Sequence, residues 1–506
     1  MSWLLWVLVA GLICWSLKRY LEHVSRYYPL TKVFHYIDTS FYNQIYFLIT
    51  HADDLFSFLT NFQQGVSPNL HRGFFMWVLG HPYMMLSGAD ELEALLRSHN
   101  NNKSREYDAL RPWLASGLFT NNGESWRARR KVLTPTFHWE VLDIYAETFR
   151  RQARILMERL EKLADSGEAF DIWPYFTAAT LDSICETMIG RHFNLQASQE
   201  KAHYVRYIQE VTELVSVRMQ GVRALVPQTL YDLSPAGRRM KACIKEINNF
   251  SDQALPIIEE RWEQQKGGVD ANANVAGRRA FLDLLIEMAR QGQLDKSEIR
   301  QEVNTFIFAG HDTSSMGLNW TVFLLGHHPQ IQERAYMEIM EHIKEDEDWR
   351  MENLKQLVYL ECIFKEALRL YPPGAIMGRK VDSDFEINGV RVPAGTHLGF
   401  APMAVHHDPR HWPDPERFDP DRFLPENAVG RHPFAFIPFS AGQRNCIGQR
   451  FAIAEAKIML GMLIRRFRIR SIHERHEVEA KCEVVLRPDP GIFVKLQRRQ
   501  PLQTDF

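Results

Sequence analysis

Cys446 is the residue of this sequence whose neighbours best suit a reactive or metal-binding thiolate. It lies in the string Phe439-Ser-Ala-Gly-Gln-Arg-Asn-Cys-Ile-Gly448, between Gly442 and Gly448 and just before an apolar helical run. Two glycines permit a tight turn that can aim backbone N–H groups at the sulfur, which lowers a thiol pKa and stabilises thiolate. Arg444 adds a cation that can pair with a carboxylate of a ligand. A lone cysteine is usually a small buried apolar residue, but glycines and an arginine suit that role poorly.

The composition narrows the class of protein. The chain has 506 residues and six cysteines, at positions 14, 185, 243, 362, 446 and 482. No two of them are close in sequence, so neither a CxxC zinc site nor a dense disulfide framework is expected, and a reduced compartment is favoured. Lys plus Arg number 60 and Asp plus Glu number 62, a net charge of −2. This balance argues against a nucleic-acid binder held by a global positive field.

A second candidate site is the string Ala309-Gly-His-Asp-Thr-Ser314, inside a helical run from Ser297 to Gly326. A glycine within a helix costs about 1 kcal/mol relative to alanine, and a threonine hydroxyl that bonds back to a carbonyl loosens the helix. Together they favour a local distortion that can seat a small ligand and water. An equally good alternative is a helix N-cap, with Asp312 or Thr313 starting a second helix.

Two charged pairs have helical spacing. Glu366 and Arg369 lie at i and i+3 in a helix predicted over residues 355–370, where they can form an ion pair. An ordinary surface pair is the alternative, and such pairs contribute little stability. Trp126 and Arg130 lie at i and i+4 and share a helical face.

These strings resemble the signatures of the cytochrome P-450 monooxygenases. Cys446 stands in F-x-x-G-x-R-x-C-x-G, the haem-binding signature of that family, with Phe439, Gly442 and Gly448 in their places. The resemblance covers essentially the whole chain after the first 20 residues. It implies that Cys446 is the thiolate ligand of the iron of haem b (iron-protoporphyrin IX), which is the metal site.

The resemblance also implies roles for the charged pairs. Glu366 and Arg369 match the family's buried E-x-x-R pair, and Arg417 in Pro-Glu-Arg-Phe stands where its third member is expected, so these three have a structural role. Trp126 and Arg130 match residues that hydrogen-bond one haem propionate. Arg379 matches an arginine that holds the other propionate, and Arg444 joins this cofactor-binding group.

The distal helix and the substrate cavity follow from the same resemblance. Asp312 and Thr313 match the catalytic groups that organise proton delivery to dioxygen. Four apolar residues match positions that line the substrate cavity, although each is equally compatible with ordinary core: Phe308, Ala309, Ile376 and Ile492.

Several strings, including Phe306-Ile-Phe-Ala-Gly-His-Asp-Thr313, most resemble the animal fourth family, the fatty-acid ω-hydroxylase group. The resemblance implies insertion of one oxygen atom of O2 into a C–H bond of a fatty acid or related lipid. Many members of that group carry a glutamate that esterifies haem at the position of Ala309, so non-covalent haem is predicted here. A foreign lipophilic substrate stays an alternative. So do a reductase-independent haem-thiolate isomerase or dehydratase and a non-enzymatic haem sensor or lipid binder.

The N-terminal run Trp3 to Leu17 carries no charge, and Lys18 and Arg19 follow at once. A bilayer core of about 30 Å needs around 20 helical residues, so residues 1–20 are predicted to be a short transmembrane signal-anchor. A cleaved signal peptide and a buried core helix are the alternatives, but no positive residues precede the run and no small-residue cleavage site follows it. Positive charge after the run predicts that the bulk of the protein stays on the cytosolic side. The predicted location is the endoplasmic reticulum membrane, with a single pass and the catalytic domain facing the cytosol.

The fold class is predicted as mainly α with a minor β component: a cytochrome P-450 fold with a single haem domain at 51–506, after a membrane-proximal segment at 21–50. Gly267 to Gly277 is small and polar, which favours an exposed loop over a domain boundary. The Asn388-Gly389 pair between two β-type runs predicts a hairpin.

The resemblance implies an NADPH-cytochrome P-450 reductase as partner, which binds NADPH and passes its electrons on, so this chain does not bind NADPH directly. Cytochrome b5 is a further candidate partner. The substrate implied is a lipophilic small molecule. No nucleic-acid partner is implied. A basic patch is predicted as the docking surface for an acidic reductase, with an ordinary solvated face as the alternative. Its residues are Arg127, Arg129, Lys131, Arg465, Arg466 and Arg468.

Overall fold

The structure is a computed structural model that describes residues 72–78, 81–100, 102–197, 202–219, 226–254 and 281–500, with short pieces between 18 and 36 and between 223 and 263. The predicted anchor from Trp3 to Leu17 and the predicted loop from Gly267 to Gly277 lie outside the described residues. Within the described part of the chain, no helix is both long enough and apolar enough to cross a bilayer.

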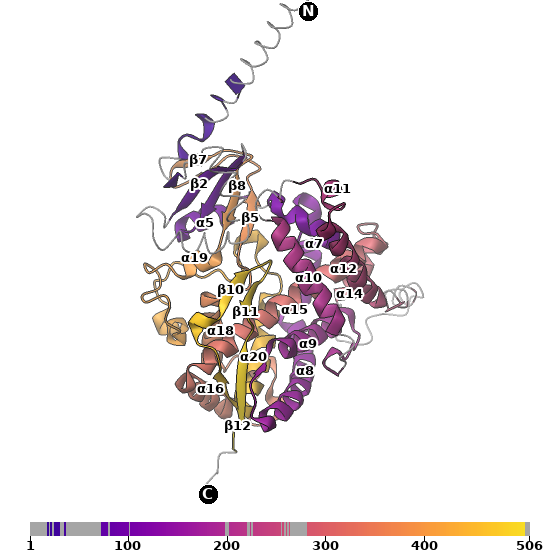
Figure 1. The fold of residues 1–506 in the computed structure, drawn as a ribbon, viewed down its shortest axis with the longest axis vertical. Helices are drawn as coiled ribbons and strands as arrows, with labels where there is room; N and C mark the ends of the chain where they lie inside the picture. The colour runs from indigo at the N-terminus through magenta and orange to yellow at the C-terminus, as the bar shows by residue number, and fades with distance from the viewer. Residues whose placement is uncertain are drawn as a thin grey trace, which may run out of the picture.

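Helices make up most of the described structure, as predicted (Figure 1). The helices around the site are α7 (Gly123–Leu133), α8 (Trp139–Ser166), α9 (Trp173–Ile184), α10 (Ala202–Met219), α15 (Lys296–Gly326), α18 (Val358–Leu370) and α20 (Gln449–Arg466). The others are α5 (Ala89–Arg97), α6 (Arg111–Leu114), α11 (Gln228–Tyr231), α12 (Pro235–Ser251), α14 (Phe281–Arg290), α16 (Pro329–His342), α17 (Met351–Leu354) and α19 (Pro402–His406).

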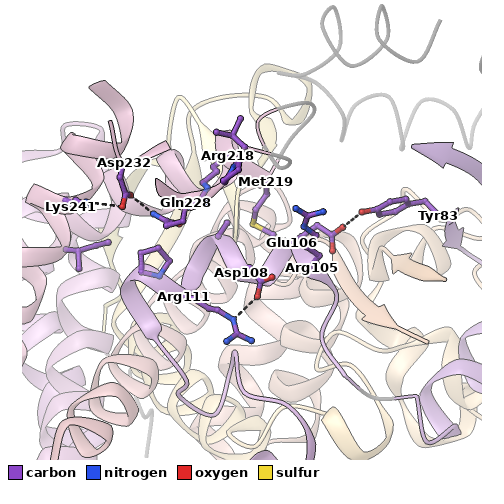
Figure 2. A pocket seen from close by; sticks show the side chains of 15 residues that line it. Tyr83, Arg105, Glu106, Asp108, Arg111, Arg218, Met219, Gln228, Asp232 and Lys241 are labelled. Carbon is purple, nitrogen blue, oxygen red and sulfur yellow. Dashed lines mark hydrogen bonds and ion pairs between the residues drawn. The ribbon is translucent and has the colours of Figure 1, made fainter. Parts of the chain in front are cut away.

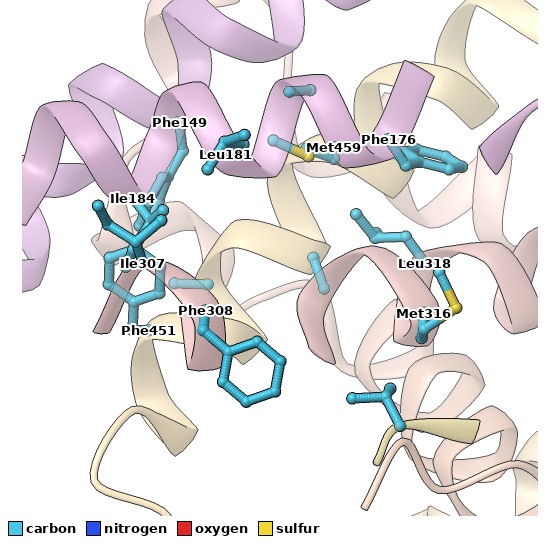
Figure 3. Close-up of a cluster of buried hydrophobic side chains, with 14 of the residues drawn as sticks. Phe149, Phe176, Leu181, Ile184, Ile307, Phe308, Met316, Leu318, Phe451 and Met459 are labelled. Atoms are coloured by element: carbon cyan, nitrogen blue, oxygen red, sulfur yellow. The ribbon is translucent and has the colours of Figure 1, made fainter. Parts of the chain in front are cut away.

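Helix α15 is the central element of the core. A capping box begins it, in which Asp295 accepts from the backbone of Glu298 and the Glu298 side chain accepts from the backbone of Asp295. Its apolar residues are buried on several sides, which is typical of a helix enclosed by others. Figure 3 shows Ile307 and Phe308 of this helix in a cluster with Ile184 of α9 and Phe451 of α20.

The strands form small sheets. The five-stranded sheet has the order β1 (His35–Tyr36), β2 (Gly73–Val78), β3 (His81–Leu86), β8 (His397–Phe400) and β5 (Met377–Lys380), and it lies with α5 at one end of the molecule (Figure 1). A three-stranded sheet has the order β4 (Phe170–Asp171), β12 (Phe493–Arg498) and β9 (Phe467–Ser471), and a separate hairpin pairs β10 (Glu479–Cys482) with β11 (Leu486–Asp489).

The predicted Asn-Gly hairpin is confirmed. Strands β6 (Phe385–Ile387) and β7 (Val390–Val392) pair antiparallel, with Ile387 opposite Val390. The two turn residues, Asn388 and Gly389, have φ of +51° and +76°, the left-handed backbone that a two-residue hairpin turn requires. The fold class of mainly helix with small sheets is therefore confirmed for the described residues.

Candidate functional site

The backbone fixes the loop that carries Cys446. Its N–H donates to the carbonyl oxygen of Phe439 at 2.8 Å, and α20 begins three residues later at Gln449. Gly442 has φ of +69°, and a Cβ at this position would lie 1.9 Å from the carbonyl oxygen of Leu96. Both the backbone conformation and the close approach exclude a side chain there. The first glycine of the motif is thus required by the shape of the loop.

The thiol of Cys446 is enclosed by protein and still accessible. Part of the Cys446 residue is exposed to solvent. The protein atoms around its sulfur still remove solvation, and this raises the pKa of the thiol more than the backbone N–H of Gly448 and the guanidinium of Arg130 lower it. The expectation that this loop by itself lowers the thiol pKa is therefore wrong, because loss of solvation favours the neutral thiol. A thiolate at this position is favoured by a metal cation bound at the sulfur.

Three cations, Lys103, Arg379 and Arg444, gather on the side of the loop that faces α7 and β5. The Lys103 ammonium lies 4.1 Å from the ring centre of Tyr107, and the Arg444 guanidinium lies 3.7 Å from the ring centre of Trp126. Arg379 is only 2% exposed. Burial lowers the pKa of Lys103 well below its ordinary value, and the charges of Arg379 and Arg444 lower it further. These cations therefore repel one another in a desolvated space.

The cation cluster fits a bound polyanion. Burial, and then the charge of Arg379, lower the pKa of Arg444 to about 9. The Nη2 atom of Arg379 is buried without a hydrogen-bond partner, and neither Lys103 nor Arg379 pairs with a carboxylate among the described residues. Buried charges are normally paired, so a ligand with two carboxylates beside Cys446 would satisfy this group. A haem has that property, and the residues present fit it. Lys103 carries no motif and was missed from the sequence.

Trp126 and Arg130 lie beside the same loop. Arg130 donates to the backbone oxygen of Asn445 at 2.8 Å and to its Oδ1 at 2.7 Å. Trp126 is buried beneath Arg444, which donates to the backbone oxygen of Asn121 at 2.8 Å. Arg130 thus steadies the residue that precedes Cys446. Contact of Trp126 and Arg130 with a haem propionate stays a prediction.

Helix α15 presents the distal candidates. It runs unbroken through the string, so the alternative of a second helix that starts at Asp312 or Thr313 is wrong, and no break marks a local distortion. The Thr313 hydroxyl donates to the carbonyl oxygen of Ala309 at 2.7 Å, as expected. A Cβ on Gly310 would lie 2.5 Å from the side chain of Ile184. The glycine therefore serves close packing between α15 and α9.

Ala309 and Thr313 lie one turn apart and are both partly exposed, whereas the residues from Glu302 to Phe308 are buried. Their shared face is therefore the accessible face of the middle of α15. Asp312 points elsewhere: it is 2% exposed, and its Oδ2 accepts from Nη2 of Arg487 at 2.8 Å. Sequence reasoning missed Arg487, because 175 residues separate it from its partner.

The four predicted substrate residues have different surroundings. Phe308 is buried, with its ring centre 4.6 Å from that of Trp113, and Ala309 is partly exposed beside it. Ile376 is 37% exposed. Ile492 is fully buried, and its N–H donates to Oδ1 of Asp171 at 3.2 Å, so the structure places it in the ordinary core. A substrate contact is therefore no longer expected of Ile492.

The ion pair of α18 is buried, which excludes the surface-pair alternative. Glu366 and Arg369 are both 0% exposed, and two hydrogen bonds of 2.8 and 2.9 Å join them. The third side chain is Arg422, whose Nε lies 3.5 Å from the Glu366 carboxylate. The assignment of this role to Arg417 is therefore wrong. Arg417 offers only its carbonyl oxygen to Arg369, at 3.1 Å, while its side chain is 66% exposed and pairs with Asp419.

The predicted basic patch also needs correction. Arg129 is buried, and it forms ion pairs with Glu298 and Glu302 of α15. It therefore belongs to the core and not to a docking surface. Arg466 and Arg468 pair with Glu161 and Glu333 respectively, so the charge of that part of the patch is largely balanced. Arg127 and Lys131 of α7 are exposed and stay as candidates for docking, although Arg127 also pairs with Glu124.

A cavity of about 610 Å³ lies between the segment 105–112, the end of α10, and α11 and α12 (Figure 2). Figure 2 shows that polar pairs line it: Arg111 contacts Asp108 at 2.7 Å, and Lys241 contacts Asp232 at 2.9 Å. None of the sequence-predicted site residues lines this cavity. The cavity is therefore a feature separate from the cysteine loop.

Glu455 of α20 is a buried carboxyl that the sequence did not single out. It is 1% exposed, and burial raises its pKa to about 8 in spite of the nearby hydroxyls of Ser314 and Ser183. At neutral pH it is therefore largely a neutral acid in the folded protein and a carboxylate in the unfolded chain. The folded state binds the extra proton, so folding stability falls as pH rises from about 4.5 to about 8.

Glu455→Gln is expected to remove this pH dependence. The variant keeps the shape and cannot ionise, so its free energy of unfolding relative to the natural protein should rise by a few kcal/mol between pH 5 and pH 8. Thermal unfolding followed by circular dichroism at several pH values measures the difference. The exposed Glu426→Gln variant is the control. Parallel pH curves for the natural protein and Glu455→Gln would contradict the assignment.

A cytochrome P450 family model matches residues 41–496. Human cytochrome P450 4V2 is 40% identical over 435 residues, which cover 84% of this chain and 82% of that protein. Cytochrome P450 4c3 of Drosophila melanogaster is 38% identical over 463 residues (88% and 85%), and human cytochrome P450 4F8 is 35% identical over 440 residues (84% and 83%). These similarities extend well beyond the cysteine loop and its local string.

Proposed function

The chain belongs to the cytochrome P450 family, and on this premise we propose that it hydroxylates long-chain lipids, fatty acids above all, with electrons from NADPH. Membership of the family makes it a haem-thiolate monooxygenase. Its similarity to the fourth-family proteins and the strings shared with the fatty-acid hydroxylase group support the choice of substrate class. Ala309 adds a small apolar side chain on the accessible face of α15 that leaves room for an aliphatic chain.

The observation that carries the proposal is the placing of an accessible thiol, Cys446, beside Arg444 and two further cations, Lys103 and Arg379, which pair with no carboxylate among the described residues. Cys446 would hold the iron, and Lys103, Arg379 and Arg444 would hold the two propionates. When bound, the haem supplies the reduction of dioxygen and the insertion of one oxygen atom into a C–H bond. Ala309 has no carboxylate, so the haem is held without an ester bond.

The residues of α15 control water and protons. Thr313 donates its hydroxyl proton to the Ala309 carbonyl oxygen, so its oxygen lone pairs are available to accept a hydrogen bond from a water on the accessible face. Asp312 is buried behind that face, and its carboxylate is held by Arg487. Thr313 can therefore hold a water on that face for proton delivery, and Asp312 lies directly behind it in its pair with Arg487.

Electron supply and location form part of the proposal. An NADPH-cytochrome P450 reductase docks on the α7 side of the cysteine loop, where Arg127 and Lys131 supply positive charge. The apolar run Trp3 to Leu17, with Lys18 and Arg19 after it, anchors the protein in the endoplasmic reticulum membrane with its body in the cytosol.

A binding and turnover screen tests the proposal. The purified full chain with haem is titrated with medium- and long-chain fatty acids and with lipophilic drugs, and the shift of the haem absorption band is recorded. The ligands that bind are then incubated with NADPH and reductase. Hydroxylated fatty acid that forms only with both additions is the expected result. Turnover of drugs alone would overturn the substrate class, and rearrangement of a lipid peroxide without reductase would overturn the hydroxylase assignment.

A further inference from the structure

Arg487 of β11 joins three elements through one buried guanidinium. Its side chain is 5% exposed. Nη2 donates to Oδ2 of Asp312 on α15 at 2.8 Å and to Oγ1 of Thr212 on α10 at 3.2 Å, and Nε donates to Oε2 of Glu483 at 2.7 Å. The same guanidinium lies 5.3 Å from the ring centre of Trp173, the first residue of α9. The arginine therefore sits where α9, α10, α15 and the β10–β11 hairpin meet.

The backbone beside Arg487 is fixed independently of this ion pair. The N–H of Leu486 donates to the carbonyl oxygen of Pro373 at 2.9 Å, and its carbonyl oxygen accepts from Nε1 of Trp320 on α15 at 3.1 Å. Both bonds hold the hairpin against the core whatever the charge state of Asp312. The position of the guanidinium is thus set by the scaffold, and the guanidinium in turn sets the position of the carboxylate.

The pairing decides what the Asp312 carboxylate can do. A buried carboxylate without a partner is costly. Arg487 is the cation that the Asp312 carboxylate contacts in the described part of the chain, and the other acid on that guanidinium, Glu483, is more exposed. Asp312 is adjacent to Thr313, whose hydroxyl borders the accessible face of α15.

We propose that Arg487 is a positioning residue for proton delivery, which holds the Asp312 carboxylate in place and oriented behind Thr313. The inference rests on the proposed monooxygenase function, in which Asp312 and Thr313 serve oxygen reduction. It extends the site to the C-terminal hairpin, which contributes no residue to the haem ligand loop. Loss of the guanidinium should therefore affect the use of electrons more than the binding of substrate.

Coupling is the measurement that separates this role from a structural one. The variants are Arg487→Lys, which keeps the charge and loses the planar set of donors, and the triple variant Asp312→Asn/Glu483→Gln/Arg487→Met, which removes the arginine together with both acids that pair with it. Each haem-loaded protein is given substrate, reductase and NADPH, and the product formed per NADPH consumed is compared with hydrogen peroxide released. Thr313→Ala serves as the reference for uncoupling.

Both Arg487 variants are expected to lose coupling about tenfold or more, with substrate affinity from the absorption shift changed less than threefold. Arg499→Lys is the matched control, because Arg499 is also 5% exposed and pairs with an acid, Glu333, away from α15. Its coupling should equal that of the natural protein.

Hydrogen–deuterium exchange supplies a readout independent of turnover. In Arg487→Lys, faster exchange is expected in residues 305–315, with no change at Leu486 or in α20. The inference is overturned if either folded Arg487 variant couples like the natural protein, or if Arg499→Lys loses coupling to the same degree. A natural protein that consumes no NADPH with reductase would instead refute the proposed function.

Discussion

Replacing Cys446 by serine is expected to abolish the absorption band of the carbon monoxide complex that a thiolate-ligated ferrous haem gives, and to lower turnover by more than about 100-fold. Loss of outer-shell partners alone lowers metal affinity or activity by roughly 10- to 100-fold, and here the ligand atom itself changes. A serine oxygen donates far less electron density than a thiolate, so the iron loses the ligand that favours O–O cleavage.

The loop around Cys446 should survive the substitution. The anchoring bond from its N–H to Phe439 uses backbone atoms, and the tight approach of Gly442 to Leu96 is unchanged. Haem content, measured after extraction, should therefore fall less than activity. Cys482→Ser, a change at a partly buried cysteine outside the site, is the control and should keep the band. A natural-type band in folded Cys446→Ser protein would refute the ligand assignment.

The parts of the site that could be predicted from the sequence are those encoded over a few residues. The left-handed backbone of the cysteine loop requires Gly442, which is a local property, and the α18 pair needs only i and i+3 spacing. The close approach of Leu96 to that glycine depends on packing and could not be predicted. Arg487 and Lys103 could not be found in this way, because their partners are brought to them by the packing of distant segments. The burial of Arg129 could not be predicted either, because the sequence of α7 does not show that α15 packs over this residue.

The error over Arg417 has a different cause. The pattern Pro-x-Arg-Phe occurs twice within nine residues, at Pro415 to Phe418 and again at Pro420 to Phe423. Both copies satisfy the local motif, and only the path of the chain over α18 selects the second. The main helices and the β6–β7 hairpin were predictable because apolar periodicity and turn residues act locally, whereas the choice between two equal motifs depends on tertiary contacts.

Arg422→Ala and Arg417→Ala are expected to differ strongly in stability. Arg422 has a side chain only 11% exposed, 3.5 Å from the fully buried carboxylate of Glu366. Its loss removes one of two cations from that carboxylate, for which we expect a cost of roughly 2–3 kcal/mol, below the full cost of breaking a buried pair because Arg369 remains. Arg417→Ala removes an exposed contact of 3.8 Å to Asp419, worth less than about 1 kcal/mol.

Thermal unfolding of the two variants, with the yield of haem-loaded protein, measures this difference. Arg422→Ala should lower the melting temperature by several degrees and reduce haem incorporation, because the Glu366–Arg369 pair ties α18 to the chain around Asp419 and His406. Arg417→Ala should resemble the natural protein, since its carbonyl oxygen still accepts from Arg369. If instead Arg417→Ala were the more damaging change, its side chain and not that of Arg422 would complete the buried ion group.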